Sequence, residues 1–213
     1  MRSQTSQVYE EIKKRIIDGT YHPSETLTEL ALASEFSVSR NTVKKALLML
    51  QSDKLVVIEE SKRARVRSFS LEEMTQYLSL RELIESFVVR ESVPFLTEGD
   101  LSEMHGILDE MERCYNEHNL LEYSKNNWRF HDVIYRACPN RPAVEMTLAI
   151  KNQFKRFNVR TILIPGRDNN SFSEHKAIMD ALDQRDAATA ATMMGMHIAN
   201  MADILKKNYS ILF

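Results

Sequence analysis

The sequence predicts a mainly α protein in two parts, a winged helix-turn-helix at residues 1–69 and an all-α antiparallel helical bundle at residues 70–213. Two observations lead to this fold class. Apolar residues recur at helical spacing up to Leu50 and are followed by two short β-rich segments, which is the order of a helix-turn-helix with its wing. Beyond residue 70 every periodic segment has helical spacing and the connections are short, as in a helical bundle.

The strongest signal in the first part is the segment 39–50. Ser39 is a good N-cap residue, and apolar residues follow it at i, i+3, i+4 and i+7 spacing. The opposite face is basic, and its first turn carries Arg40 and Asn41, at the end that a recognition helix presents to DNA bases. The buried face of this helix is predicted to consist of Val43, Ala46, Leu47 and Leu50.

The neighbouring segments complete the predicted fold. A first helix covers residues 7–18, with Gly19 as its stop, and a short amphipathic helix covers residues 27–36. In that second helix Leu27, Leu30 and Ala31 are expected to face inward, with Ala33 and Phe36 as further candidates. The β-rich segments 55–58 and 64–67 enclose a polar stretch and predict a two-stranded hairpin.

These segments resemble the GntR family of bacterial transcription regulators. The resemblance lies in Tyr9-x-x-Ile12-x-x-x-Ile16-Ile17-x-Gly19-x-Tyr21-x-Pro23, in Leu27-Thr28-Glu29-x-x-Leu32-Ala33, and in Val38-Ser39-Arg40-x-x-Val43-Lys44-Lys45-Ala46-Leu47-x-x-Leu50. The sequence departs from the family where Thr42 replaces Pro, Lys44 replaces Arg and Arg63 replaces Gly. The resemblance implies binding to a double-stranded DNA operator. The expected DNA contacts are Arg40, Asn41, Thr42, Lys44, Lys45, Lys62, Arg63 and Arg65.

Charge is divided unevenly along the chain. The net charge is -2, but residues 1–69 carry twelve Lys and Arg against nine Asp and Glu, a net charge of +3, and the rest of the chain is acidic. The basic excess therefore coincides with the predicted DNA-binding part. No apolar run is long enough to span a bilayer and the first residues lack the apolar core of a signal peptide, so a cytoplasmic protein without membrane contact is expected.

The second part shows six helical segments. It resembles the FCD ligand-binding domain of the FadR-type branch of GntR regulators, in the shorter, six-helix VanR-like version. The resemblance lies in Arg81-Glu82-Leu83-Ile84-Glu85, Phe130-His131, Asn140-x-Pro142, Glu174-His175-x-x-Ile178 and His197. It implies that a small effector, commonly an organic acid, enters the bundle and alters DNA affinity.

Three of the six histidines, His131, His175 and His197, lie on apolar stripes of three different helices. Neutral imidazoles that meet at one point are suitable ligands for a divalent transition metal, so zinc or nickel is expected there. In the FCD family an acidic residue four positions before the first histidine completes the site, and here that position is Asn127. The alternative is a polar cavity without metal.

Arg81 is the candidate effector ligand, because a guanidinium that faces the cavity would bind a carboxylate through two hydrogen bonds. The alternative is a surface ion pair with Glu85 at i+4. Both remain open from the sequence.

The sequence therefore predicts a homodimeric regulator that binds a pseudo-palindromic operator and is modulated by a small carboxylate. Two other readings stay open: a metal-dependent hydrolase on the bundle, and a DNA-binding dimer without a ligand. A hydrolase needs a general base beside the metal-bound water. Glu174 is next to His175 but points about 100° away on a helix. No HExxH motif, nucleophile elbow or Gly-rich loop occurs, so a protein that is not an enzyme is expected.

Overall fold

The computed structural model describes residues 3–209 except 59–62, 163 and 165–166, and it leaves the side chains of 155–162, 168 and 169 undescribed. The contacts divide the chain into two compact units, one up to Ser70 and one from Leu71. The boundary predicted from the sequence lies between residues 69 and 70. Each unit is treated by itself.

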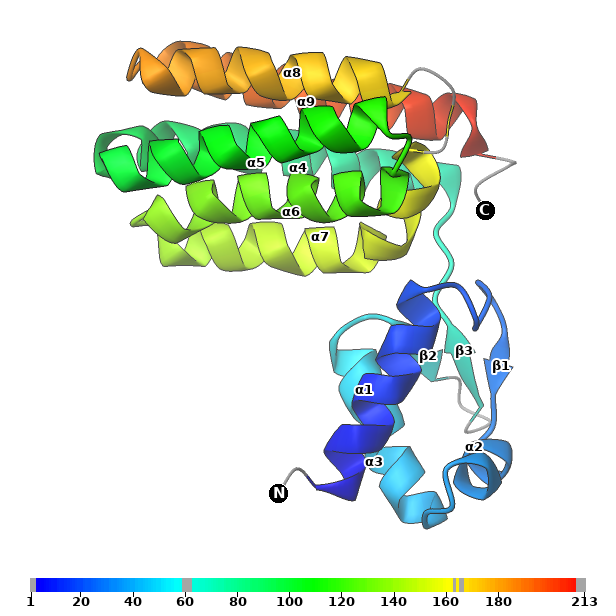
Figure 1. Ribbon diagram of the computed structural model, residues 1–213. Helices are drawn as coiled ribbons and strands as arrows, with labels where there is room; N and C mark the ends of the chain where they lie inside the picture. Colours follow the sequence, from blue (N-terminus) through cyan, green and yellow to red (C-terminus); the bar gives the residue numbers. More distant parts are fainter. Residues whose placement is uncertain (1–2, 59–62, 163, 165–166, 210–213) are drawn as a thin grey trace. The chain divides into compact units, whose positions relative to one another are not determined.

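The first unit combines helices with a small sheet (Figure 1). Its elements are α1 (Gln4–Ile17), β1 (Thr26–Leu27), α2 (Glu29–Glu35), α3 (Arg40–Ser52), β2 (Val56–Ile58) and β3 (Ala64–Val66). The described strands pair antiparallel in the order β1-β3-β2, with Arg65 opposite Val57 on one side and Thr26 on the other. The predicted hairpin is confirmed as β2 and β3, but the short edge strand β1 was not predicted.

The second predicted helix begins later than expected. Thr28 is its N-cap and accepts a hydrogen bond from the Ala31 backbone N–H, so Leu27 belongs to β1 rather than to the helix. This shift changes which residues face the core: Leu32 and Ala33 are buried, whereas Leu30 is 69% exposed. The inward orientation predicted for Leu30 and Ala31 is therefore wrong, whereas Leu27 and Ala33 are buried as predicted.

Helix α3 agrees with the prediction for its cap and for its buried face. The Ser39 Oγ accepts a hydrogen bond from the Thr42 backbone N–H at 3.1 Å, which satisfies one of the free donors of the first turn. The residues that α3 buries against the core of the first unit are Val43, Ala46, Leu47 and Leu50.

Replacing Ser39 with Ala is expected to lower the free energy of unfolding by about 1 kcal/mol, because the Thr42 N–H loses its partner. Urea unfolding followed by circular dichroism measures the change. Ser34→Ala, at an exposed position inside α2, is the control and should change stability by less than about 0.5 kcal/mol. Equal effects of the two substitutions would contradict the capping role.

The second unit is a helical bundle, as predicted (Figure 1). Within the described residues it contains α4 (Leu71–Ser92), the 3-10 helix η1 (Val93–Phe95), α5 (Glu98–Asn116), α6 (Leu120–Ala137), α7 (Arg141–Ile162), α8 (Arg167–Asp183) and α9 (Ala187–Lys207). Helix α4 packs mainly on α9, and α5 packs on α6 and α8. None of the helices in the described ranges combines the length and hydropathy that a membrane crossing requires.

Helix α4 buries an ion pair within its apolar face and leaves two leucines exposed. Arg81 and Glu85 are 3% and 1% exposed, whereas Leu80 and Leu83 are 47% and 70% exposed. A helix that turns an ion pair inward and leucines outward gives up apolar burial, so the buried pair needs an explanation beyond packing.

Candidate DNA interface and interior histidine site

The basic face of α3 lies on the outside of the first unit. Arg40, Asn41, Lys44 and Lys45 are exposed. The Arg40 side chain is 68% exposed, and its guanidinium lies 3.5 Å from the Glu29 carboxylate. Long basic side chains that extend from the first two turns of such a helix can reach base edges and phosphates.

The other predicted DNA contacts differ in their surroundings. The Thr42 hydroxyl lies 2.9 Å from Ser39 Oγ, so it takes part in the helix cap. Arg63, directly before β3, is exposed, and so is Arg65 within that strand. Lys62 lies outside the described residues. Contacts of any of these side chains with DNA remain predictions.

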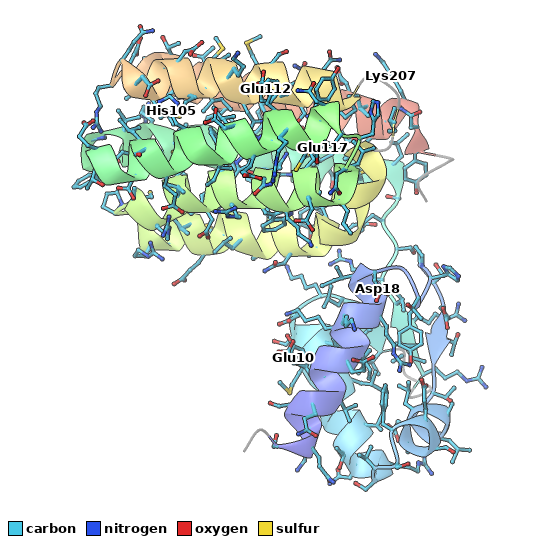
Figure 2. The ribbon with its side chains drawn as sticks, in the orientation of Figure 1. Glu10, Asp18, His105, Glu112, Glu117 and Lys207 are labelled. Carbon is cyan, nitrogen blue, oxygen red and sulfur yellow. The ribbon has the colours of Figure 1, made fainter. Side chains whose placement is uncertain are left out.

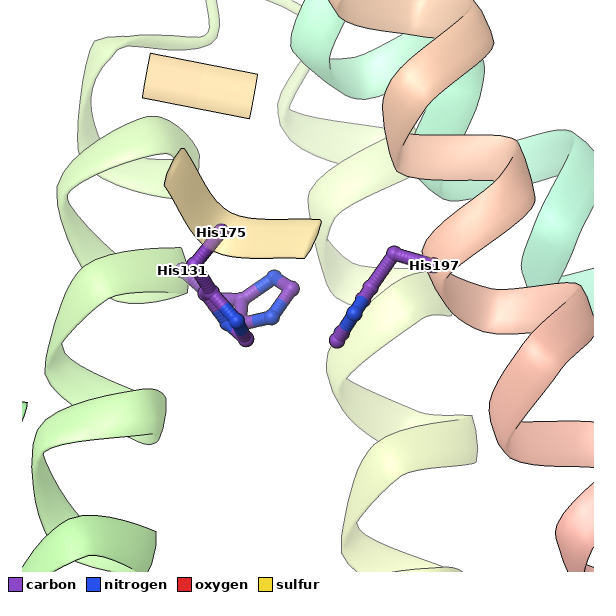
Figure 3. A group of neighbouring side chains, drawn as sticks. All are labelled: His131, His175 and His197. Atoms are coloured by element: carbon purple, nitrogen blue, oxygen red, sulfur yellow. The ribbon is translucent and has the colours of Figure 1, made fainter. Parts of the chain in front are cut away.

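The structure brings the three predicted histidines together in the interior of the second unit (Figure 3). His131 comes from α6, His175 from α8 and His197 from α9, and each is at most 3% exposed. Their candidate ligand atoms all lie within 4.8 Å of one another. The closest pair of rings, His175 and His197, has centroids 4.6 Å apart.

The hydrogen bonds of two of the three rings leave nitrogen lone pairs free in the centre. The His175 Nδ1–H donates to the Ser171 carbonyl oxygen at 2.6 Å, and the His197 Nδ1–H donates to Glu174 Oε2 at 2.7 Å. Both acceptors carry no proton, so the tautomers are set and Nε2 of each ring bears a lone pair. Nδ1 of His131 lies 3.3 Å from Glu85 Oε2.

Several of these nitrogens are buried without a hydrogen-bond partner in the described structure: both nitrogens of His131 and Nε2 of His175. Burial lowers the pKa of His131 to about 3 and holds the pKa values of His175 and His197 below the usual histidine value of 6.5. The rings are therefore neutral at pH 7, which is the form that binds a metal. The residues fit a divalent ion such as zinc or nickel.

Carboxylates lie behind two of the three histidines. Glu174 accepts from His197, from Arg167 Nη1 at 2.9 Å and from Asn200 at 2.9 Å. Burial alone would raise the pKa of Glu174, but the hydrogen bond from His197 and the charge of Arg167 bring it below its ordinary value. A carboxylate that orients a ligand histidine and keeps its tautomer is typical of metal sites.

This arrangement bears on two predicted roles. Glu174 is held by three donors, so its oxygens are engaged in positioning His197 and are not available as a base beside a bound water. Asn127 is half-buried one helical turn before His131 on α6. Its role as a fourth ligand remains a prediction.

Arg81 has the predicted partner in an unexpected environment. Its Nε donates to Glu85 Oε1, but the pair is buried rather than on the surface. Tyr135 donates to Glu85 Oε2 at 2.5 Å, and Lys151 donates to the Tyr135 hydroxyl oxygen at 2.7 Å. We call Arg81, Glu85, Tyr135 and Lys151 the buried charge cluster; it adjoins the histidines through the contact between Glu85 and His131.

Sequence reasoning missed Tyr135 and Lys151, although a signal was present. Arg81 and Glu85 continue the buried stripe of α4 at i, i+3 and i+4 spacing, and Lys151 lies in line with Val144, Thr147 and Phe154 on α7. A basic side chain inside an apolar stripe predicts a buried charge.

The remaining histidines lie away from this site. Figure 2 shows His105 on α5, where its Nε2 lies 3.0 Å from the Asp183 carboxylate at the end of α8. Its side chain is 54% exposed. His22 and His118 are exposed outside the described helices. Only the histidines on the predicted apolar stripes converge within the described part of the chain.

Comparison with known families agrees with both parts of the fold. A family model described as bacterial regulatory proteins, gntR family, matches residues 4–66, and one described as FCD domain matches residues 76–200. The HTH-type transcriptional repressor GlaR of Escherichia coli K12 is 25% identical over 210 residues, which cover 93% of this chain and 94% of that protein. The gluconate operon transcriptional repressor of Bacillus subtilis is 31% identical over 127 residues, 60% of this chain and 52% of that protein.

Solved structures show the same fold. The E. coli protein McbR/YncC superposes with a TM-score of 0.80 at 20% identity, covering 98% of this chain and all of that chain (100%). A putative GntR regulator from Rhodococcus sp. RHA1 has a TM-score of 0.76 at 22% identity, over 96% of this chain and 98% of that one. At these identities the likeness supports the fold and not the ligand.

Proposed function

Because this chain belongs to the GntR family of bacterial transcription regulators and carries an FCD domain, we propose that it binds operator DNA as a homodimer and that a small acid in its bundle changes the affinity for DNA. Repression is the proposed direction, since GlaR and the gluconate operon regulator are both named repressors. The convergence of the three buried histidines supports the ligand site most directly.

The proposed DNA contact is made by α3 and the wing. The exposed side chains at the α3 tip read bases, and the basic residues of β3 contact phosphates. A two-fold dimer would place two such helices in successive major grooves, which requires a pseudo-palindromic operator. Sedimentation equilibrium of the full chain with and without operator DNA tests the dimer.

Replacing Arg40 with Ala is expected to weaken operator binding by about 1–3 kcal/mol, roughly 10- to 100-fold in Kd. Arg40 is the first residue of α3, and its exposed side chain lies at the helix end that is proposed to enter the major groove. The operator is first isolated from genomic DNA fragments with the wild-type protein, and binding is then measured by fluorescence anisotropy at fixed salt concentration.

Arg113→Ala is the matched control. Arg113 is 62% exposed and paired with Glu110, much as Arg40 is 68% exposed and paired with Glu29, but it lies on α5 of the second unit. It should bind the operator as the wild type does. An Arg40→Ala protein with unchanged Kd would exclude the proposed reading helix.

The proposed ligand site consists of the three histidines with zinc or nickel, with Asn127 as a further oxygen donor. Three neutral imidazoles around such an ion leave coordination positions open, and the ion when bound supplies Lewis acidity that attracts a carboxylate. Arg81 is proposed to stabilise the same acid from the buried charge cluster through its positive charge.

Coupling to DNA requires that the acid bind the DNA-competent and DNA-incompetent forms with different affinity. Helix α4 connects the two events along the chain, since it begins at Leu71, directly after the first unit, and carries Arg81 and Glu85. Anisotropy titrations of operator complexes with small carboxylates test this coupling. A shift of operator Kd by an acid that also raises Tm supports it, and the absence of such an acid favours a DNA-binding dimer without a ligand.

A further inference from the structure

The buried charge cluster contains two basic groups and a single carboxylate. Both oxygens of Glu85 are engaged, Oε1 by Arg81 Nε and Oε2 by the Tyr135 hydroxyl. Lys151 donates to the phenol oxygen of Tyr135 at 2.7 Å, and its Nζ is 3.9 Å from Glu85 Oε2. The amine therefore has a neutral hydrogen-bond acceptor and no carboxylate at hydrogen-bond distance among the described contacts.

The surroundings of Lys151 compensate its charge only in part. Its Nζ lies 4.8 Å from the ring centroids of both Trp128 and Tyr135, a stabilising but weak arrangement. The other charged groups that act on it are Arg81, which repels it, and Asp132, which is 62% exposed. The carboxylate nearest to this amine, Glu85 at 3.9 Å, already accepts hydrogen bonds from Arg81 and Tyr135. An amine that is 2% exposed and shares its carboxylate in this way costs more than a methionine of similar length, so packing does not explain Lys151.

The position of the Lys151 amine near the histidines suggests why a charged group is buried there. Tyr135 connects Lys151 to the histidine site, because its ring centroid is 6.1 Å from that of His131. An anion at Lys151 that does not belong to the chain would compensate the excess positive charge.

We propose that the Lys151 amine forms an anion subsite beside the histidines, and that the ligand is a small acid with two anionic groups, one held at the histidines and one at Lys151. The proposal rests on the proposed function, which takes the first group to be bound at the metal. It narrows the ligand class from carboxylates in general to dicarboxylates and other short diacids.

Binding of the second anionic group should take up a proton. Burial lowers the pKa of Lys151 to about 7, with Arg81 adding to the effect and Glu85 opposing it. An anion at Nζ favours the protonated form, so the dianion binds more tightly as the pH falls from about 8 to about 6.5.

Succinate and butyrate are matched probes, since they share a four-carbon chain and differ by one carboxylate. Trp128 is the only tryptophan in the sequence, and it lies next to Lys151, so its fluorescence reports binding. In the zinc-loaded wild type we expect succinate to bind at least about tenfold more tightly than butyrate, as for a hydrogen bond to a charged group. This preference should be larger at pH 6.5 than at pH 8.

Three variants separate the subsite from other effects. Lys151→Met should bind both acids within about twofold of each other and lose the pH dependence, because the charge is gone. Lys151→Arg keeps the charge and should keep the preference. Lys206→Met, which removes a surface lysine on α9, should behave as the wild type. Circular dichroism checks that each variant is folded.

Each result supports or overturns the subsite. A Lys151→Met protein that keeps the preference for succinate overturns it, as does a wild type that binds both acids equally or binds neither. The rise in Tm with zinc alone is measured separately, and Lys151→Met should retain it. If zinc raises Tm in neither the wild type nor Lys151→Met, the metal part of the proposed function fails. The subsite is then tested without metal: it stands if the wild type prefers succinate to butyrate and Lys151→Met does not, and it falls otherwise.

Discussion

His175→Ala is expected to abolish the stabilisation that zinc or nickel gives to the wild-type protein. At a metal concentration about a thousand times Kd, binding stabilises a protein by about 4 kcal/mol. For a domain of this size that corresponds to a rise in Tm of roughly 10 °C. The variant removes the imidazole whose tautomer is set by Ser171 and whose Nε2 is buried without a partner. Differential scanning calorimetry with and without added metal, after treatment with a chelator, measures the difference.

The control must distinguish the interior site from adventitious binding by histidines. His105→Ala removes a histidine that is 54% exposed and contacts Asp183 at the surface. It should keep the full rise in Tm, and elemental analysis of untagged protein should find equal metal in His105→Ala and wild type. A His175→Ala protein that still responds to metal as the wild type does would place the metal elsewhere.

The fold could be read from the sequence because its signals are local. The cap at Ser39 and the apolar positions that follow it depend on residues within a few turns, and the structure has both as predicted. The errors in the first unit arose from a tertiary effect. Residues Thr26 and Leu27 pair with β3, far along the chain, and this pairing moves the start of α2 to Glu29.

The interior site was predictable only in part. Periodicity places His131, His175 and His197 on inward faces, but it does not give the distance between helices, so their convergence is a result of the structure. The cluster behind them depends on contacts between helices. Glu85 of α4 meets Tyr135 of α6, and that tyrosine accepts from Lys151 of α7, and no spacing within one helix contains this information.

Glu85→Gln is expected to lower the free energy of unfolding by about 3–5 kcal/mol, because it leaves the Arg81 guanidinium buried without its carboxylate. The charge of Arg81 holds the pKa of Glu85 well below its ordinary value of 4.5 despite the burial that opposes it. A carboxyl with a lowered pKa contributes stability that is fully present above its unfolded-state pKa and is lost as the pH falls through the folded-state value. The difference between wild type and variant should therefore be constant above pH 4.5 and shrink only in stronger acid.

Urea unfolding followed by circular dichroism measures this loss, with Glu91→Gln as the control on the same helix. Glu91 is 40% exposed beside Arg90, so its loss should cost at most about 1 kcal/mol. A loss of that size for Glu85→Gln as well would mean that Glu85 does not neutralise Arg81.

The double variant Arg81→Met/Glu85→Leu then shows what the buried pair is for. Replacing both partners of a buried ion pair by apolar residues of similar volume is often neutral for stability. Because Glu85 also accepts from Tyr135, we expect the double variant to lose some stability, but less than Glu85→Gln, and yet to lose the response of operator binding to carboxylates. A double variant that is more stable than Glu85→Gln but unresponsive to carboxylates would show that Arg81 and Glu85 serve ligand recognition rather than folding.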